Sequence, residues 1–340
     1  MSLLLMVASA PGFAVVVEDL YEAEVAVKDH SAQALSAASR EALSEVLVKV
    51  SGSVAVLQNP AIGTALGEAR SYVQQYSYTR DEDARGDLAA RFEFDRSVVS
   101  RLVTEAGAPL WTANRPAVLV WIVAQDAKGR QFVSREVAPD VMMTLEQGFS
   151  QRGVPVRFPL FDLQDTASLA IDDAWRLQAA PIFNASERYG VQDILAGRLT
   201  GLSTGEWVGD WTYFSGRNRI DRSLTVDSVD SFLLEGVSLV AEQMAGRYAV
   251  AASGATAGGI AMTVAGVNSY GDYAKIVSWL EGLELIEHAN IETIRGQEIE
   301  LRLVARADAG QLKTIIELNK RLTPLEQVRG TDQLSYQWQN

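Results

Sequence analysis

Residues 189–216 read YGVQDILAGRLTGLSTGEWVGDWTYFSG, and this segment decides the fold of the middle of the chain. Gly190 follows a short helical pattern and predicts a helix stop, and an apolar run then crosses Gly197. A glycine within a strand marks a close approach of backbone or a side chain, so Gly197 is expected in a packed strand. Gly205 and Gly216 bracket one further strand, which predicts a hairpin from the centre to the edge of a sheet.

The residues around this segment predict a sheet with crossover helices. AVLVWIVAQD is continuously apolar, as is typical of a strand buried on both faces. The predicted elements are strands over 117–126, 154–159 and 191–199, helices over 138–153 and 179–190, two alternating strands about Ser215-Gly216, and an amphipathic helix over 228–248. The β-α-β-α-β order favours parallel strands, and the hairpin adds antiparallel ones, so a mixed sheet is expected.

The C-terminal segment carries the clearest pattern. AASGATAGG (251–259) is small and flexible, which is typical of a linker between domains. After it, residues 260–338 show the order strand, helix, strand, strand, helix, strand. This order is the split βαβ of ferredoxin-like folds.

The N-terminal segment predicts a strand-helix-helix-strand-strand-helix unit over 15–107. Ser31 caps its first helix, and Gly52 ends that helix. APLWTANRP (108–116) holds two prolines and little periodicity, which predicts a linker. The sequence therefore indicates α/β and α+β classes in three small domains. Their boundaries are 1–14 for a signal peptide, 15–112 for the first domain, 115–250 for the second and 258–340 for the third.

Composition excludes several functions. The chain has 340 residues and a net charge of −13, so binding to nucleic acid is not expected. It contains no cysteine, which excludes disulfides, thiolate metal sites and cysteine nucleophiles. No second apolar run of ~18 residues follows the N-terminus, so no transmembrane segment is expected.

The first residues favour export. Leu3 to Ala14 form an apolar stretch that is too short to span a bilayer. It resembles the hydrophobic region of a secretory signal, with Gly12-Phe13-Ala14 as a small-x-small cleavage site. The basic residues that normally precede such a region are absent, so either the true start lies upstream or this stretch is a buried N-terminal strand.

The residue types that usually carry chemistry are few. His30 and His288 are the two histidines, and neither has a marked catalytic partner, so both are expected to be structural. The acidic clusters Asp81-Glu82-Asp83 and Asp172-Asp173 lack the alternating spacing of a calcium loop. The glycines form no phosphate-binding motif. We therefore predict no catalytic residue, no metal and no cofactor.

An aromatic set on one strand is the strongest candidate for binding. Trp207, Trp211 and Tyr213 occupy odd positions, so they share one strand face. That face could hold a partner peptide or a glycan, or it could pack beneath the helix at 228–248.

Larger segments resemble a known family. YEAEVAVKDHSAQALSAASREALSEVLVKVSG, APLWTANRPAVLVWIV and GEWVGDWTYF together resemble a proteobacterial envelope family known as domain of unknown function 2066. Within it, 115–248 is similar to the N-terminal domain of TolB and of related curli-secretion lipoproteins, through AVLVWIV, QRGVPV and YGVQDILAG. The lipobox cysteine and the β-propeller of those relatives are absent. These motifs are packing motifs, so the resemblance transfers no catalytic residue.

The resemblance implies a soluble periplasmic, non-enzymatic protein that interacts with a protein partner in a cell-envelope assembly. Such a partner would meet sheet edges or the face formed by Trp207, Trp211 and Tyr213. The alternatives are a glycan- or small-ligand-binding module that uses the same face and, with the least support, a hydrolytic enzyme.

Overall fold

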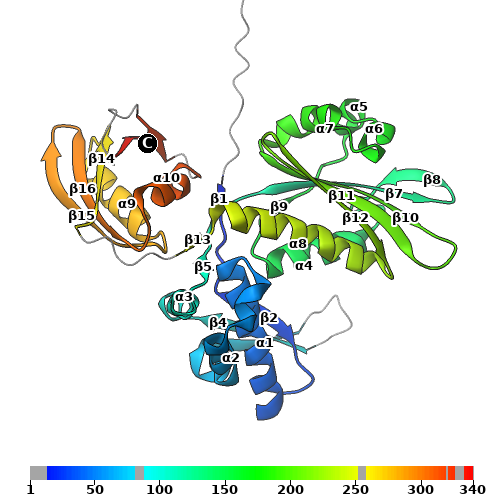
Figure 1. Ribbon diagram of the computed structural model, residues 1–340, viewed down its shortest axis with the longest axis horizontal. Coiled ribbons are helices and arrows are strands. Elements are labelled where there is room, and N and C mark those ends of the chain that lie inside the picture. The colour runs from blue at the N-terminus through cyan, green and yellow to red at the C-terminus, as the bar shows by residue number, and fades with distance from the viewer. Residues whose placement is uncertain (1–13, 81–87, 252–257, 319–320, 326–332, 340) are drawn as a thin grey trace, which may run out of the picture. The chain divides into compact units, whose positions relative to one another are not determined.

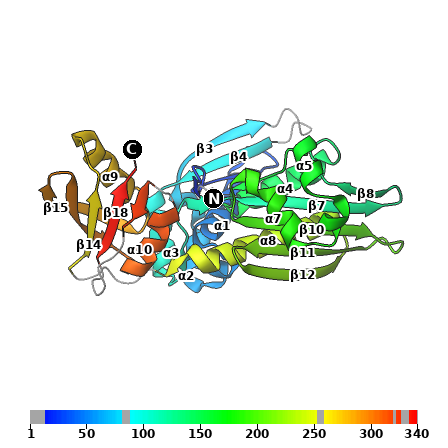
Figure 2. The same cartoon turned by 90° about the horizontal axis from the view of Figure 1, so that it is seen from above.

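The structure of the chain is a computed structural model that describes residues 14–80, 88–251, 258–318, 321–325 and 333–339 (Figures 1 and 2). Contacts divide the chain into two compact units. One unit contains Pro116–Ser150 and Val154–Val240, and the other contains Val15–Arg115, Gln151–Gly153 and Ala241–Asn340. The predicted mixture of helices with several small sheets is confirmed. The boundaries of the three domains stay a prediction.

The N-terminal segment forms a three-stranded antiparallel sheet in the order β2-β4-β3. Its elements are β1 (Ala14–Val16), β2 (Glu22–Ala26), α1 (Ala32–Ser51), the short helix η1 (Val54–Gln58), α2 (Pro60–Gly67), the short helix η2 (Ala69–Tyr72), β3 (Val73–Arg80), β4 (Leu88–Phe94) and α3 (Arg96–Glu105). The Ser31 hydroxyl accepts a hydrogen bond from the Ala34 amide at 3.1 Å, and Gly52 ends α1 with a φ of +74°. The predicted order of elements is confirmed.

The linker predicted over 108–116 is wrong. This segment contains β5 (Pro109–Leu110), which pairs with β13 (Val250–Ala251), and β6 (Asn114–Pro116), which pairs with β1. Trp111 and Arg115 are fully buried within it. Prolines at both ends obscured the prediction, but the apolar and hydrogen-bonding side chains between them fill a core rather than face water.

Arg115 is a buried cation held by backbone carbonyl groups. Its guanidinium donates hydrogen bonds to the carbonyl oxygens of Lys49 (2.7 Å), Trp111 (2.8 Å), Thr112 (2.9 Å), Gly153 (2.8 Å) and Arg152 (3.2 Å). The same group lies 3.9 Å above the Trp111 ring, which adds a cation–π contact. Burial lowers the pKa of Arg115 to about 9. Its hydrogen bonds tie together three segments that are distant in sequence.

The middle of the chain forms a mixed sheet. The strand order is β12-β11-β10-β7-β8, with β9 also beside β7; β7 runs parallel to β9 and β10, and the other pairs are antiparallel. Helices α5, α6 and α7 lie over one face, and α4 and α8 lie over the other (Figure 1). The elements are β7 (Val118–Asp126), β8 (Gly129–Phe132), α4 (Pro139–Gln151), β9 (Val156–Arg157), α5 (Leu163–Ser168), α6 (Ile171–Trp175), α7 (Ala179–Ser186), the short helix η3 (Glu187–Tyr189), β10 (Asp193–Gly201), β11 (Trp207–Ser215), β12 (Asn218–Val226) and α8 (Val229–Tyr248). The mixed sheet is as predicted, whereas β8, α5 and α6 are too short to give a periodic signal.

The C-terminal segment follows the predicted strand-helix-strand-strand-helix-strand order, but the short strand β17 is inserted before the last strand, so that strand lies parallel to the first, whereas a ferredoxin-like sheet is antiparallel throughout. Its sheet order is β15-β16-β14-β18-β17, with β14 parallel to β18 and the other pairs antiparallel. Both helices lie on one face of this sheet (Figure 1). The elements are β14 (Ile260–Ala265), α9 (Tyr270–Glu281), β15 (Ile286–Arg295), β16 (Glu298–Ala305), α10 (Ala309–Leu318), β17 (Leu322–Pro324) and β18 (Leu334–Trp338). Strand β16 is predictable because its apolar and polar residues alternate, and the apolar residues Ile299, Leu301 and Leu303 all lie in the core.

Three predictions fall on residues that the structure does not describe. They are the signal peptide with its cleavage site, apart from Ala14, the acidic cluster Asp81-Glu82-Asp83, and most of the linker at 251–259. Among the described residues, no helix has both the length and the apolar character needed to cross a membrane.

Candidate functional site

The predicted aromatic face lies mostly inside the core. Trp211 and Tyr213 are 0% and 1% exposed, and Trp207 is half-buried. The Tyr213 hydroxyl donates to the Asp193 carboxylate at 2.5 Å, which satisfies its polar end. Two of the three proposed partner-binding side chains are therefore structural, and the alternative that the face packs beneath the 228–248 helix is the one observed.

Trp211 is enclosed from three directions. Its ring stacks on Phe232 of α8 at a centroid distance of 4.5 Å, and its Nε1 donates to the Phe232 carbonyl at 2.8 Å. A Cβ on Gly197 would lie 2.3 Å from the ring, and a Cβ on Gly236 would lie 2.5 Å from it. The close approach predicted at Gly197 is thus confirmed, and the approaching group is this tryptophan.

The other residues considered in the sequence are dispersed. His30 makes an edge contact with Tyr78 at 4.2 Å, and His288 lies exposed on β15. Asp172 pairs with Arg130 at 2.6 Å, which accounts for one carboxylate of its cluster. Within the described ranges, no group of three or more histidine or carboxylate side chains is placed to hold a metal ion.

A buried carboxylate organises the loop before α5. The Asp165 side chain accepts hydrogen bonds from the Tyr189 hydroxyl at 2.5 Å and from the Phe161 amide at 2.8 Å. Arg188 bridges to it at 3.1 Å and to Asp162 at 2.7 Å. These contacts hold the backbone of Phe161 at a φ of +54°, a conformation that residues other than glycine rarely adopt. Burial, followed by the hydrogen bond to Asp165, raises the pKa of Tyr189 to about 12.

The Tyr189 shift predicts a loss of stability at alkaline pH. An unfolded tyrosine releases its proton near pH 10, whereas folded Tyr189 holds its proton to about 12. The contribution is therefore fully present below pH ~10 and is lost as the pH rises from ~10 to ~12. Tyr189→Phe should remove this part of the pH dependence, measured by urea unfolding at pH 9 and 11.5. Tyr270→Phe, at an 85% exposed site, is the control and should follow the wild-type curve; identical curves for all three proteins would contradict the assignment.

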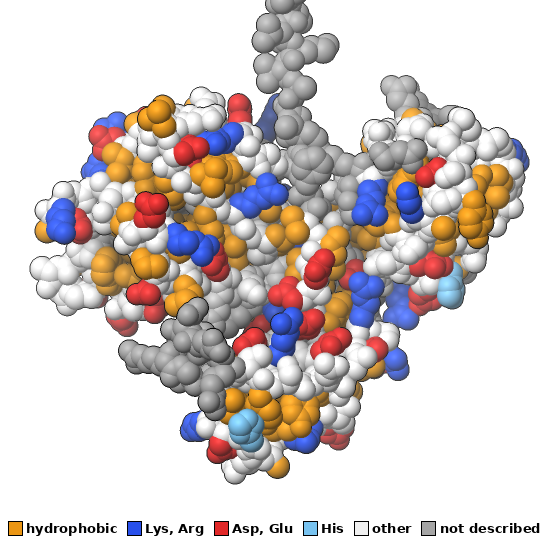
Figure 3. Space-filling view, turned by 180° about the vertical axis from the view of Figure 1, so that it is seen from behind, with side chains coloured by type: hydrophobic (Ala, Val, Ile, Leu, Met, Phe, Trp, Pro, Cys, Tyr) orange, Lys and Arg blue, Asp and Glu red, His pale blue; other side chains and the backbone are white. Residues whose placement is uncertain are grey.

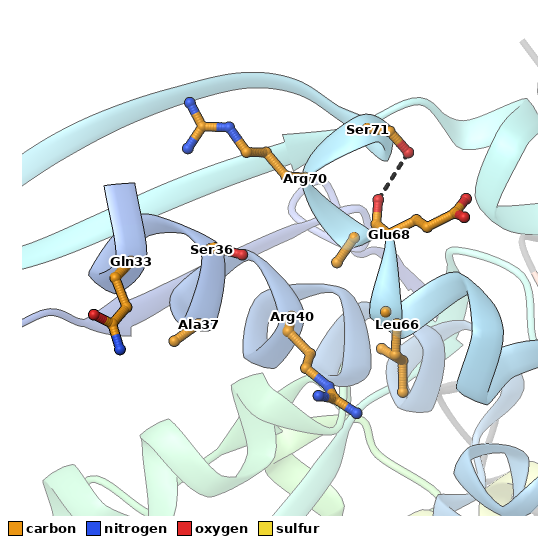
Figure 4. A pocket seen from close by; sticks show the side chains of 10 residues that line it. Gln33, Ser36, Ala37, Arg40, Leu66, Glu68, Arg70 and Ser71 are labelled. Carbon is orange, nitrogen blue, oxygen red and sulfur yellow. Dashed lines mark hydrogen bonds between the residues drawn. The ribbon is translucent and has the colours of Figure 1, made fainter. Parts of the chain in front are cut away.

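A surface groove lies between α1 and the segment that links α2 to β3. The cavity has a volume of about 910 Å³. Gln33, Ser36, Ala37 and Arg40 border it from α1, and Leu66, Glu68, Arg70 and Ser71 border it from α2 and η2 (Figure 4). The Ser71 hydroxyl donates to the Glu68 carbonyl at 2.7 Å and thereby fixes the turn of η2.

A smaller cavity continues the groove toward β3. It has a volume of about 140 Å³ and is lined by Leu35, Ser39, Arg70, Val73, Gln74, Tyr76 and Phe92. Arg70 borders both cavities, so they adjoin at its side chain. Together they form a surface that we call the β3 groove.

The edge of β3 is unusually open. β3 has eight residues and pairs with β4 alone among the described strands. Its first seven residues, Val73 to Thr79, carry no charge, and Gln74 to Ser77 are exposed. Aromatic side chains also gather here, because Tyr76 is 44% exposed and its ring lies 5.9 Å from that of Tyr78. The His30 ring also contacts that of Tyr78 at a centroid distance of 4.2 Å, and Figure 3 shows hydrophobic side chains gathered beside a histidine on one face of the molecule.

The other long edges are protected. β12 carries Arg219, Asp221 and Arg222 along nine residues. β15 carries charged residues along its length and has two irregularities in its pairing register. Charges and bulges are the devices by which proteins prevent edge strands from pairing with other chains. Compared with these two strands, β3 carries no charge from Val73 to Thr79, and its pairing with β4 has a single irregularity, between Val73 and Gln75, so the rest of its edge can accept another strand.

Comparisons with known proteins leave the function open. Residues 14–112 match a family described as Domain of unknown function (DUF8605). This matched segment of the chain includes α1, β3 and the β3 groove. The expectation of a domain of unknown function is thus confirmed in general terms, but the matched family is neither family 2066 nor a TolB-like one. A search of curated proteins found no match.

Two solved structures show only weak similarity to this chain. A crystal structure of an uncharacterized protein is 11% identical, covers 38% of this chain and 90% of its own, and has a TM-score of 0.18. A formyltetrahydrofolate deformylase from Pseudomonas putida KT2440 is 11% identical, covers 56% of this chain and 88% of its own, and has a TM-score of 0.17. At such low TM-scores, neither similarity bears on fold or function.

Proposed function

We propose that the protein is a non-enzymatic interaction component of a periplasmic cell-envelope assembly, and that it holds a partner protein at the edge of β3. The observation that carries this proposal is the exposed edge of β3, which carries no charge from Val73 to Thr79 and so differs from the charged edges of β12 and β15. An added strand would satisfy the free backbone groups of β3 and gain main-chain hydrogen bonds.

The periplasmic setting rests on the sequence. The apolar stretch from Leu3 to Ala14 is typical of an export signal, and the absence of cysteine suits an oxidising compartment. The resemblance to the envelope family 2066, and to TolB-like domains over 115–248, supports the same setting. The partner is therefore expected among proteins of the envelope.

Site-specific photocrosslinking in the native host tests this function. A benzoylphenylalanine at position 76 should form one discrete adduct, because Tyr76 lies exposed beside the open edge of β3. Mass spectrometry then identifies the attached protein. The adduct should disappear when Gln75 and Ser77 are changed to lysine, since charges on an edge strand block pairing.

A probe on another edge provides the matched control. Thr225 is exposed on β12, so benzoylphenylalanine there samples an edge already protected by charge. The proposal is abandoned if position 76 gives no adduct, or if both positions capture the same mixture of proteins.

A further inference from the structure

The charges of the β3 groove oppose those of the whole chain. The chain has a net charge of −13, yet the groove carries Arg40 and Arg70 against the single carboxylate of Glu68. Neither guanidinium has an ion-pair or hydrogen-bond partner among the described residues. By contrast, Arg91, Arg130, Arg198 and Arg302 elsewhere on the surface each pair with a carboxylate. The two groove arginines are therefore available to carboxylates of a partner.

The two arginines mark separate points along the groove. Arg40 projects from α1 and Arg70 from η2, and their side chains extend in different directions (Figure 4). They do not converge on one small anion. This spacing fits a partner with carboxylates distributed along its chain, rather than an isolated phosphate or carboxylate ion.

The smaller cavity supplies an apolar position. Leu35, Val73, Tyr76 and Phe92 line it, and its volume of about 140 Å³ is similar to the ~150 Å³ of a cavity that accepts benzene. One aliphatic side chain would fill it. Because Arg70 borders this cavity and the larger one, a carboxylate would meet Arg70 close to that aliphatic side chain.

Strand geometry relates the two positions in the partner's sequence. In a strand added to β3, alternate side chains point to the same face. Tyr76 lies opposite Phe92 in the register of β3 with β4, and both line the cavity on the α1 side. An aliphatic residue at one position and an acidic residue two positions away would thus both face the groove.

We propose that the β3 groove binds an extended acidic segment of a partner protein, with an aliphatic side chain in the smaller cavity and a carboxylate two residues away on Arg70. This inference rests on the proposed function, because it names the chemistry of the strand that β3 receives. Arg40 meets a further carboxylate along the same segment, and Glu68 disfavours a carboxylate at its own position.

Random nine-residue peptides displayed on phage, selected on the full chain, test the chemistry. The enriched sequences should alternate, with Asp or Glu two positions from Leu, Ile or Val. The best synthetic peptide should lose about tenfold in affinity on Arg70→Gln and less on Arg40→Gln, as measured by fluorescence anisotropy. Added salt should weaken binding to the wild type.

Matched variants sharpen the result. Arg101→Gln changes an exposed arginine that borders neither cavity, so the affinity should stay within about twofold. Glu68→Gln removes the opposing carboxylate and should strengthen binding by roughly twofold.

Failure of this inference differs from failure of the proposed function. Peptides that are lost on Ser77→Lys but insensitive to Arg70→Gln would leave strand addition standing and overturn the acidic chemistry. Enrichment of basic peptides, or no enriched peptide at all, would also overturn the inference. The in-cell adduct at position 76 decides the function independently of these peptides.

Discussion

Replacement of Arg115 by methionine is expected to lower the free energy of unfolding by about 3–5 kcal/mol. The variant keeps an unbranched apolar stem but removes every hydrogen-bond donor of the guanidinium. The buried carbonyl groups of Lys49, Trp111 and Gly153 would then lose a short hydrogen bond without access to water. Urea unfolding of the full chain, followed by tryptophan fluorescence, measures the loss.

Lysine at the same position separates charge from geometry. Its ammonium has three donors on a flexible stem and cannot reproduce the planar fork that reaches five carbonyl oxygens, so Arg115→Lys should also destabilise strongly. Arg101→Met on exposed α3 is the control, with an expected change within about 0.5 kcal/mol. A loss below about 1 kcal/mol for Arg115→Met would refute the role assigned to this guanidinium.

Trp211→Ala should have an effect of similar size, about 3–5 kcal/mol. The ring is fully buried between Gly197, Gly236 and Phe232. Its removal leaves a cavity, because the two glycines have no side chains that could move into the space. The variant also leaves the Phe232 carbonyl without its indole donor. Urea unfolding monitored by circular dichroism provides the readout.

Trp207 offers a control on the same strand. It is half-buried and packs against Gly201, so Trp207→Ala should cost roughly 1 kcal/mol or less. Trp211→Phe should recover part of the loss, because it keeps the stacking on Phe232. Equal losses for Trp207→Ala and Trp211→Ala would show that enclosure by the glycines is not what matters.

Periodicity made most of the fold predictable. The order of the main elements in the N-terminal and C-terminal segments follows from stretches that are long enough to show a period of 2 or 3.6 residues, whereas the three-residue strand β17 is too short to show one. Short elements such as β8, α5 and α6 span only four to six residues and give no such signal. The buried 108–116 segment was missed because two prolines suggest a linker, and nothing local shows that Arg115 finds carbonyl partners from distant segments.

The candidate site was less predictable than the fold. Period 2 correctly placed Trp211 and Tyr213 on one face, but it does not say whether a helix covers that face. The β3 groove joins α1 to η2 and β3, and its lining residues are of ordinary types that come from segments far apart in the sequence. One local signal was present: VQQYSYT is a strand pattern with no charge, unlike the other long edges.

The unprotected edge of β3 also bears on how much of this protein a cell can hold. A strand that accepts a partner's backbone accepts another copy of itself by the same hydrogen bonds. If the edge of β3 receives a partner as proposed, chains made in excess of that partner would meet one another edge to edge, and the net charge of −13 supplies the repulsion that opposes this. Under that proposal, balanced production of the two proteins would keep the edge occupied and the free chains dispersed.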